Sequence, residues 1–234
     1  MQRRYGGREY SLFHAPRFAV LLKLAGEFVP SGSSRILDIG VSEFTQILRD
    51  VFGDRVDTLD LAPDSVSEGG RQFSFDLSLS DQPGSWREDM PRYGLILMAE
   101  VMEHVYVSPL HQLRFLRSLL EPGAVLIVQT PNALSMQKRL KALAGVHPYE
   151  RIRESEKFGG HVREYTSREL REYASLAGFQ VVRLCFGSYF DARHKGYAGR
   201  AKGRPEASLS NCLNAALPAR LRPGITMVLR AGDC

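Results

Sequence analysis

Short apolar runs alternate with amphipathic periodicities along this chain, and this alternation constrains its fold more than any other feature. The first run, residues 36–39, stops at Gly40 and is followed by apolar residues at helical spacing up to Gly53. Further strand-like runs are 56–61, 93–99, 124–130, 179–186 and 227–229. Several of them are apolar enough to be buried on both faces, which indicates a parallel sheet. The sequence therefore predicts a doubly wound α/β fold with helices on both faces of the sheet.

Several predicted helices carry their own start and stop signals. An apolar face runs from Phe18 to Ala25, and Pro16 is expected near its first turn. Another helix is expected from Ser108 and Pro109, with a leucine stripe from 110 to 120 that ends at Pro122. A third has capping-box spacing over 166–169 and a glycine stop at 178.

Composition excludes several classes of protein. The chain has 234 residues, of which 44% are hydrophobic and 24% charged, so disorder, collagen and coiled coil are excluded. It lacks an apolar stretch of the roughly 20 residues that span a bilayer, and residues 1–7 lack the apolar core of a secretion signal. Cys185, Cys212 and Cys234 have no CxxC spacing and form no disulfide framework. We expect one cytoplasmic domain over residues 1–234.

Positive charge gathers outside the predicted sheet. The net charge of +5 decides little alone, but the stretches 138–157 and 193–204 are rich in lysine and arginine. An anionic acceptor would suit them, and so would an ordinary solvated surface. Both interpretations stay open.

The turn after the first predicted strand is where α/β sheets bind ligands. It reads Asp38-Ile39-Gly40-Val41-Ser42-Glu43-Phe44 and lacks the GxGxxG pattern of nicotinamide-binding folds. Asp60 ends the next strand, about 20 residues after Gly40, at the spacing that sets a carboxylate on a ribose diol. A carboxylate accepts hydrogen bonds from both hydroxyls.

Together these motifs resemble the class I S-adenosylmethionine-dependent methyltransferases. The resemblance covers residues 34–186, rests also on segments 75–77, 100–105 and 160–166, and is nearest to the ubiquinone-type and glycan-tailoring subgroup. It implies a Rossmann-like, seven-stranded sheet that is mostly parallel, with an antiparallel last strand. It also implies S-adenosyl-L-methionine as cofactor.

The resemblance assigns a cofactor-binding role to particular residues. Asp38 and Gly40 would line the methionine part, Asp60 the ribose, and Ala99 the sulfonium. The adenine would meet Asp76 and Leu77, and the predicted cofactor-binding set is completed by Ser42 and Leu61.

One departure from the family pattern bears on cofactor binding. The family usually has glycines where this chain has Ser42 and Phe44, so the backbone would approach the cofactor less closely, or the cleft would be reshaped. Phe44 could instead pack the following helix. A degenerate fold that binds no cofactor remains the alternative.

Segment 100–104 follows a central strand and holds three potential bases or ligands, Glu100, Glu103 and His104. With His161, these residues resemble the metal site of small-RNA 2′-O-methyltransferases. A divalent ion held by Glu100, Glu103, His104 and His161 could be magnesium, manganese, iron or zinc. Alternatively His104 acts as an unaided base, or the segment is structural. The predicted catalytic residues are His104, Glu103 and His161.

The predicted acceptor-binding segments are the N-terminal helix or lid, residues 1–33, and two insertions, 132–163 and 187–223. Their aromatic residues are sparse for stacking nucleic acid, so nucleic acid is a disfavoured partner. We expect a small, anionic or sugar-containing acceptor, methylated on a hydroxyl in cell-surface polysaccharide or natural-product biosynthesis. The alternatives are an RNA ribose 2′-O-methyltransferase and a non-catalytic partner subunit.

Residues 209–217 predict a helix that covers the core or, alternatively, lies at a membrane surface near anionic lipid. The sequence does not predict an oligomeric state.

Overall fold

The computed structural model describes residues 7–32, 34–61, 69–149, 160–194 and 205–232. Its centre is a seven-stranded sheet in the order β3-β2-β1-β4-β5-β7-β6. The strands are β1 (Ile36–Ile39), β2 (Val56–Asp60), β3 (Gln72–Ser74), β4 (Tyr93–Ala99), β5 (Leu120–Pro131), β6 (Phe179–Gly187) and β7 (Gly224–Ala231). Strands β1 to β5 pair in parallel, and β7 pairs antiparallel with both β5 and β6. The predicted fold class and the antiparallel last strand are confirmed.

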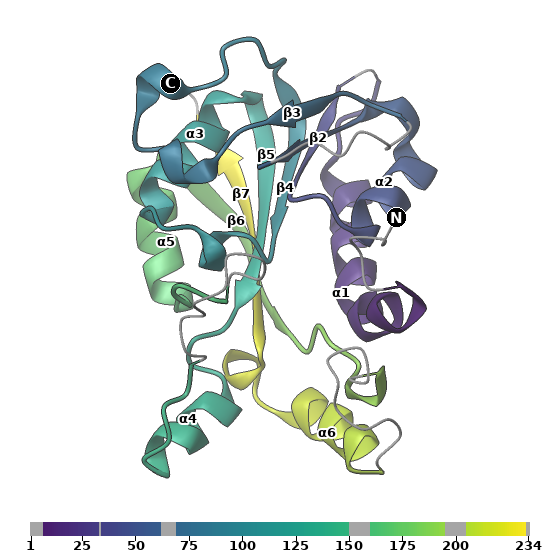
Figure 1. The fold of residues 1–234 in the computed structure, drawn as a ribbon, viewed down its shortest axis with the longest axis vertical. Helices are drawn as coiled ribbons and strands as arrows, with labels where there is room; N and C mark the ends of the chain where they lie inside the picture. Colours follow the sequence, from purple (N-terminus) through teal and green to yellow (C-terminus); the bar gives the residue numbers. More distant parts are fainter. Residues whose placement is uncertain (1–6, 33, 62–68, 150–159, 195–204, 233–234) are drawn as a thin grey trace.

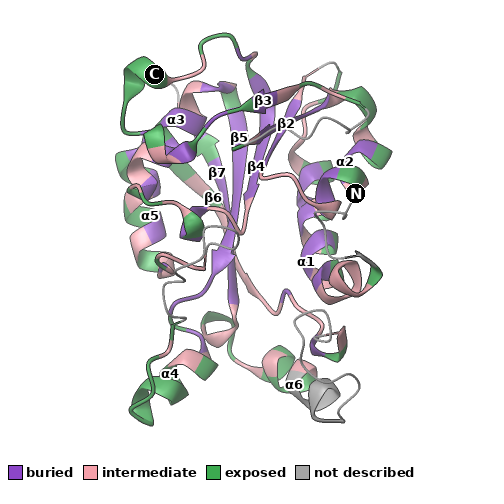
Figure 2. Ribbon diagram, in the orientation of Figure 1, coloured by how far each residue is buried: buried purple, intermediate pink, exposed green. Residues whose placement is uncertain are grey.

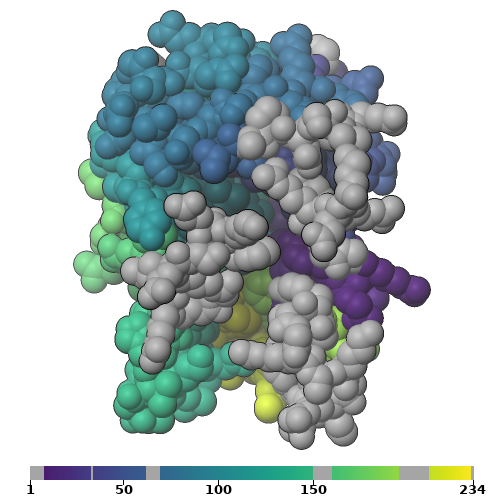
Figure 3. Space-filling model, in the orientation of Figure 1, coloured from purple at the N-terminus to yellow at the C-terminus, as the bar shows by residue number. Residues whose placement is uncertain are grey.

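Helices cover both faces of this sheet (Figure 1). The described helices are α1 (Gly7–Phe28), α2 (Glu43–Phe52), α3 (Pro109–Ser118), α4 (Met136–Leu143), α5 (Ser167–Leu176) and α6 (Pro205–Ala216). The α1 and α2 helices lie on one side of the sheet, and α3 and α5 lie on the other. The α4 and α6 helices lie beyond the sheet, past the end where β4 stops, and α4 forms the lower left of the surface in Figure 3.

The core has two layers because the central strands bury both faces. Side chains alternate along β4, so Leu95 and Leu97 join the cluster under α1 and α2, while Ile96 and Met98 join the cluster under α3 and α5. Figure 2 shows the buried residues concentrated along the sheet and the helices facing it. Full burial of one such side chain is worth about 1.5–3 kcal/mol.

The α1 helix differs from the prediction at its start. It begins at Gly7, and Pro16 lies inside it. Proline in a helix removes one backbone hydrogen bond and kinks the axis, and burial of Phe18, Leu21 and Ala25 against the sheet offsets this cost. The apolar face itself is confirmed.

The boundary between α3 and β5 also differs. Leu120 was expected on the helix, but α3 ends at Ser118 and Leu120 pairs with Tyr93 as the first residue of β5. The sequence predicts an element boundary at Pro122, but β5 continues from Leu120 through Pro122 and Gly123. Gly123 has φ +69°, a conformation that glycine adopts without strain.

Two described elements escaped prediction, and one prediction was wrong. The β3 strand is too short, at three residues, to show a period. The α4 helix was missed although Met136, Leu140 and Leu143 stand at helical spacing, and the structure buries none of its residues. For the 209–217 segment, a core-covering helix was the favoured prediction, but Leu213 is 58% exposed and Ala216 is exposed. None of the described helices has the length and apolar character needed to cross a membrane.

Candidate active site

The turn between β1 and α2 requires glycine at position 40. Gly40 has φ +81°, in the region that L side chains avoid, and its N–H donates to the Leu59 carbonyl at 2.9 Å. A Cβ atom there would lie 2.9 Å from Cγ2 of Val101. The backbone is therefore closely packed at the predicted methionine end of the cofactor site.

Ser42 is the N-cap of α2. Its hydroxyl accepts from the Phe44 N–H at 3.2 Å, and its own N–H donates to the Thr45 hydroxyl at 3.0 Å. Serine thus replaces the family glycine with a helix cap. The N-terminus of α2 has a partial positive charge and N–H groups without helical partners. It therefore stabilises a negatively charged group of a ligand more than a neutral one.

Phe44 points into the core and leaves the turn open. Its side chain is 3% exposed, and it belongs to the cluster that packs beneath α1 and α2. Of the two predicted consequences of Phe44, packing of the following helix is the one observed.

Asp60 holds the turn from the end of β2. One carboxylate oxygen accepts from the Val41 N–H at 3.1 Å, and the other accepts from the Leu61 N–H at 2.6 Å. Each oxygen retains a lone pair for a further donor. Leu61 is exposed. The Asp60 carboxylate is therefore oriented at the carboxyl edge of the sheet, as a ribose-binding group must be.

Asp76 and Leu77 lie on the same edge, just after β3. Asp76 is exposed and accepts from the Ser78 N–H at 2.8 Å, and Leu77 is buried. The β2 and β3 strands pair in parallel, which brings Asp76 near Asp60 along the edge. This adjacency agrees with neighbouring ribose and adenine positions.

Asp38 lies behind the turn. It is buried, and its carboxylate accepts from the Thr45 hydroxyl at 2.6 Å. Burial raises the pKa of Asp38 to about 7, against the opposing effect of the Thr45 hydrogen bond. Asp38 thus fixes the first turn of α2 from inside the protein.

Segment 100–104 follows β4 and begins in a strained conformation. Glu100 has φ +57°, the only positive φ among the described non-glycine residues, and its N–H donates to the Gln129 carbonyl at 2.8 Å. Its carboxylate lies 3.8 Å from Nη1 of Arg17. Burial raises the pKa of Glu100 above its usual range, although Arg17 opposes the shift.

Glu103 joins this segment to the distant 160–165 segment. Its carbonyl accepts from the N–H groups of Val162, at 2.8 Å, and Arg163, at 3.3 Å. Its side chain is fully buried, with one carboxylate oxygen accepting from the Thr130 hydroxyl at 3.0 Å. The other oxygen has no hydrogen-bond partner among the described residues. Burial and the Glu100 charge raise the pKa of Glu103 well above its usual range.

The histidines of these two segments meet as a result. The rings of His104 and His161 lie 4.9 Å apart, edge to face. His104 Nδ1 lies 3.3 Å from the Gly160 carbonyl, and His161 Nδ1 lies 3.0 Å from the Glu164 carboxylate. Segments more than 50 residues apart in sequence thus supply one pair of imidazoles.

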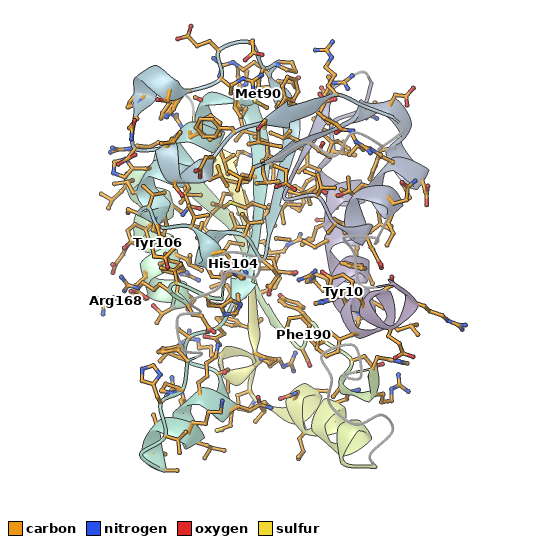
Figure 4. All side chains as sticks on the ribbon, viewed as in Figure 1. Tyr10, Met90, His104, Tyr106, Arg168 and Phe190 are labelled. Carbon is orange, nitrogen blue, oxygen red and sulfur yellow. The ribbon has the colours of Figure 1, made fainter. Side chains whose placement is uncertain are left out.

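One cavity of about 610 Å³ joins the turn to the histidines. Its walls include six of the predicted site residues: Gly40, Ser42, Ala99, Glu100, His104 and His161. Six others contribute no wall to it: Asp38, Asp60, Leu61, Asp76, Leu77 and Glu103. Figure 4 shows His104 facing Tyr10 and Phe190 across this region. A hollow of about 890 Å³ lies elsewhere, beside the start of β5, and holds none of the predicted site residues.

Four further cavity residues lie within the predicted acceptor-binding segments 1–33 and 187–223 but were not predicted as site residues: Tyr10, Phe13, Arg17 and Phe190. Arg17, on α1, is 5% exposed, and its Nε has no hydrogen-bond partner among the described residues. Three aromatic rings, those of Tyr10, Phe13 and Phe190, form what we call the aromatic wall. Phe13 and Phe190 stack at 5.0 Å, and the Phe13 carbonyl accepts from the Asp191 N–H at 2.8 Å. Only packing of α1 against the 187–194 segment creates this wall.

Three predicted metal ligands converge, and the fourth does not join them. Among the described residues, Glu103, His104 and His161 each offer a ligand atom, all within 4.8 Å of one another. A carboxylate with two imidazoles is a donor set that suits zinc, manganese or iron. The buried, unbonded oxygen of Glu103 is consistent with such an ion. Glu100 lies outside this group and faces Arg17.

Comparison with solved structures supports the fold. A SAM-dependent methyltransferase from Archaeoglobus fulgidus is 14% identical, with a TM-score of 0.57 over 93% of this chain and 94% of its own. A Burkholderia thailandensis 1,6-didemethyltoxoflavin N1-methyltransferase with bound S-adenosylhomocysteine is 17% identical, with a TM-score of 0.52 over 93% and 77%. The [4+2]-cyclase SpnF is 14% identical, with a TM-score of 0.60 over 99% and 86%. Likeness at this level shows the fold alone.

Comparison with family models identifies the family. No curated protein matches the sequence. A family model described as a methyltransferase domain matches residues 9–184, which include the cofactor turn, segment 100–104 and His161. The chain therefore belongs to the methyltransferase domain family, within the class I S-adenosylmethionine-dependent methyltransferases.

Proposed function

We propose that this protein transfers the methyl group of S-adenosyl-L-methionine to a hydroxyl of a small, sugar-containing, anionic metabolite in cell-surface polysaccharide or natural-product biosynthesis. One observation carries the proposal: a single cavity is lined by both Gly40 of the cofactor turn and the imidazoles of His104 and His161. Methyl transfer is an in-line displacement, so it requires a donor and a deprotonated acceptor in one enclosed space.

The cofactor would lie along the carboxyl edge of β1, β2 and β4. Its ribose would donate to Asp60, and its methionine part would lie over Gly40, near the N-terminus of α2. The guanidinium of Arg17 would meet the methionine carboxylate, because Arg17 is buried, lines the cavity and is 3.8 Å from its nearest anionic partner, Glu100.

The acceptor would lie between the aromatic wall and the histidines. Aromatic rings stack on the apolar faces of sugar rings as well as on planar rings. The basic composition of the stretches 138–157 and 193–204 favours an acceptor that carries a phosphate or carboxylate. The exposed His104 would take the hydroxyl proton, because a neutral imidazole has one ring nitrogen that accepts a proton.

A divalent ion fits the same histidines. Glu103, His104 and His161 would hold it, and the ion would lower the pKa of the acceptor hydroxyl. His104 as a base without a metal remains the alternative, and chelation separates the two. With the purified protein, chelator should abolish turnover and Glu103→Ala should abolish metal uptake. Full turnover in chelator would leave His104 as the unaided base.

Two measurements test the proposed function. Calorimetry should detect S-adenosylhomocysteine binding, and a protein without such binding would be a non-catalytic subunit. Isotope-labelled S-adenosylmethionine should then label a small glycan or glycolipid fraction of an extract. Label in RNA, with binding to RNA that weakens steeply as salt rises, would favour the ribose methyltransferase alternative.

A further inference from the structure

Glu164 and His161 form a partly buried pair that the proposed chemistry does not use. Nδ1 of His161 lies 3.0 Å from Oε1 of Glu164, whose side chain is 5% exposed. An ionised carboxylate only accepts hydrogen bonds, so Nδ1 must carry the proton of this bond. The neutral imidazole then has its lone pair on Nε2.

Lys138 binds the other oxygen of the same carboxylate. Its ammonium contacts Oε2 of Glu164 and also donates to the Asn132 carbonyl at 3.1 Å. An ammonium has three donors and no acceptor. The Glu164 carboxylate therefore bridges two donors, one from α4 and one from the 160–165 segment.

The backbone holds this arrangement in place. The Val162 N–H donates to the Glu103 carbonyl at 2.8 Å, and the Ala133 N–H donates to the Tyr165 carbonyl at 3.1 Å. These bonds tie the segment on both sides of Glu164 to the carboxyl edge of the sheet. His161 and Glu164 thus keep a fixed separation at the cavity that both of them line.

We propose that Glu164, clamped by Lys138, is a positioning residue that keeps His161 in the Nδ1–H tautomer and so leaves Nε2 for the acceptor or for a metal ion. A carboxylate that accepts from one ring nitrogen of a histidine leaves the lone pair on the other nitrogen. This arrangement suits a histidine that acts as a base as well as one that binds a metal. The tautomer follows from the contacts above, whereas its effect on turnover rests on the proposed methyl transfer.

The Lys138 contact makes a decisive substitution available. In Glu164→Gln the amide has one acceptor oxygen and one donor nitrogen. Lys138 can only donate, so it will take the oxygen, and the NH₂ group will face His161 and force the Nε2–H tautomer. In the double variant Glu164→Gln with Lys138→Met, the amide can turn its oxygen back toward His161. The matched control is Glu164→Asp, which keeps an acceptor-only group.

The readout is the ¹⁵N spectrum of the histidine rings in labelled protein, recorded at a pH where the spectra no longer change. The chain has six histidines, and His161→Asn identifies the signals of His161. We expect the Nδ1–H form in the wild type and in Glu164→Asp, the Nε2–H form in Glu164→Gln, and a return to Nδ1–H in the double variant. An Nε2–H wild type, or an unchanged tautomer in Glu164→Gln, overturns the proposal. The wild-type spectrum decides even where a variant fails to fold.

Turnover gives the second readout. The assay measures methyl transfer from labelled S-adenosylmethionine to the extract fraction that accepts the label. In Glu164→Gln, kcat should fall by about 10²- to 10⁴-fold while KM stays within about threefold. The analogous substitution in serine proteases imposes the wrong histidine tautomer and lowers kcat by about 10⁴-fold. The double variant should regain at least tenfold of this loss. Equal kcat in wild type and Glu164→Gln would overturn the positioning role. Absence of methyl transfer in the wild type would instead refute the proposed function and leave the tautomer result standing.

Discussion

The ring of Phe44 stacks on that of Phe18, with centroids 5.4 Å apart and planes inclined by 22°. This contact joins α2 to α1 and turns the phenylalanine away from the cofactor turn. The substitution of a family glycine by Phe44 therefore supplies core packing and leaves the cleft open.

Replacement of this ring should affect stability alone. Phe44→Ala removes a side chain that is 3% exposed and should lower the free energy of unfolding by about 3–5 kcal/mol. Because the ring is outside the cleft, the affinity for S-adenosylhomocysteine should stay within about twofold at a temperature where the variant is folded. Denaturant titration and calorimetry measure the two quantities. A tenfold tighter complex would mean that Phe44 obstructs the site.

Gly40→Ala should affect both quantities. A positive φ costs a non-glycine residue about 1–2 kcal/mol, and the new Cβ would press on Val101. We expect S-adenosylhomocysteine affinity to fall at least tenfold. Gly123→Ala is the matched control, because Gly123 has φ +69° with nothing within 4 Å of its added Cβ. That control should lose only the stability that the positive φ costs, and it should keep its affinity. Equal affinities in the two variants would show that Gly40 does not contact the cofactor.

Asp60→Asn should weaken S-adenosylhomocysteine binding by about 10- to 100-fold, because it removes the charge that accepts from the ribose hydroxyls. The asparagine oxygen can still accept from one backbone N–H, but its NH₂ group would face the other, so we expect a lower melting temperature with the fold retained. Asp89→Asn, an exposed residue paired with Arg87, serves as the control. Calorimetry on both variants makes the comparison, and equal affinities would contradict the ribose assignment.

Asp38 should make stability fall as pH rises. Its pKa is about 7 in the folded protein and 3.8 without burial, so the folded state binds the proton more tightly. This favourable contribution is complete below pH 4 and is lost as pH rises to 7, by up to about 4 kcal/mol. Asp38→Asn should therefore gain stability relative to the wild type between pH 5 and pH 8 in denaturant titrations. A constant difference across this range would show that Asp38 ionises normally.

His14 should act in the opposite direction. Burial and the neighbouring charge of Arg17 lower the pKa of His14 from 6.5 to about 3. The unfolded chain then binds the proton more tightly, so this contribution is present above pH 6.5 and is lost as pH falls toward 3. His14→Phe should lose less stability than the wild type between pH 7 and pH 4. Parallel acid-unfolding curves for the two proteins would contradict the shift.

Local signals in the sequence predicted much of the fold. The β4 strand is apolar on both faces, and Thr166 and Glu169 form the predicted capping box at the start of α5. Such features depend on neighbours within a few residues, so the sequence displays them directly. The β3 strand has three residues and is held by pairing with β2, which no local pattern encodes.

The candidate site was predicted where its residues follow strand ends. Gly40, Asp60 and segment 100–104 occupy the carboxyl ends of β1, β2 and β4, as the order of elements required. His161 was found only through the family resemblance. The Arg17–Glu100 and Lys138–Glu164 contacts form only because α1 and α4 pack near segments that are distant in sequence. The spacing of polar residues along a helix does not predict such contacts.

The position of β7 in the sheet has a kinetic consequence. Strand β6 contacts β5 only through β7, which follows β6 by more than 30 residues in the chain. During biosynthesis β6 therefore has an unpaired edge until β7 is synthesised and inserts between β5 and β6. We expect this late insertion to limit the folding rate, because pairing across a long loop incurs the closure entropy before any contact forms.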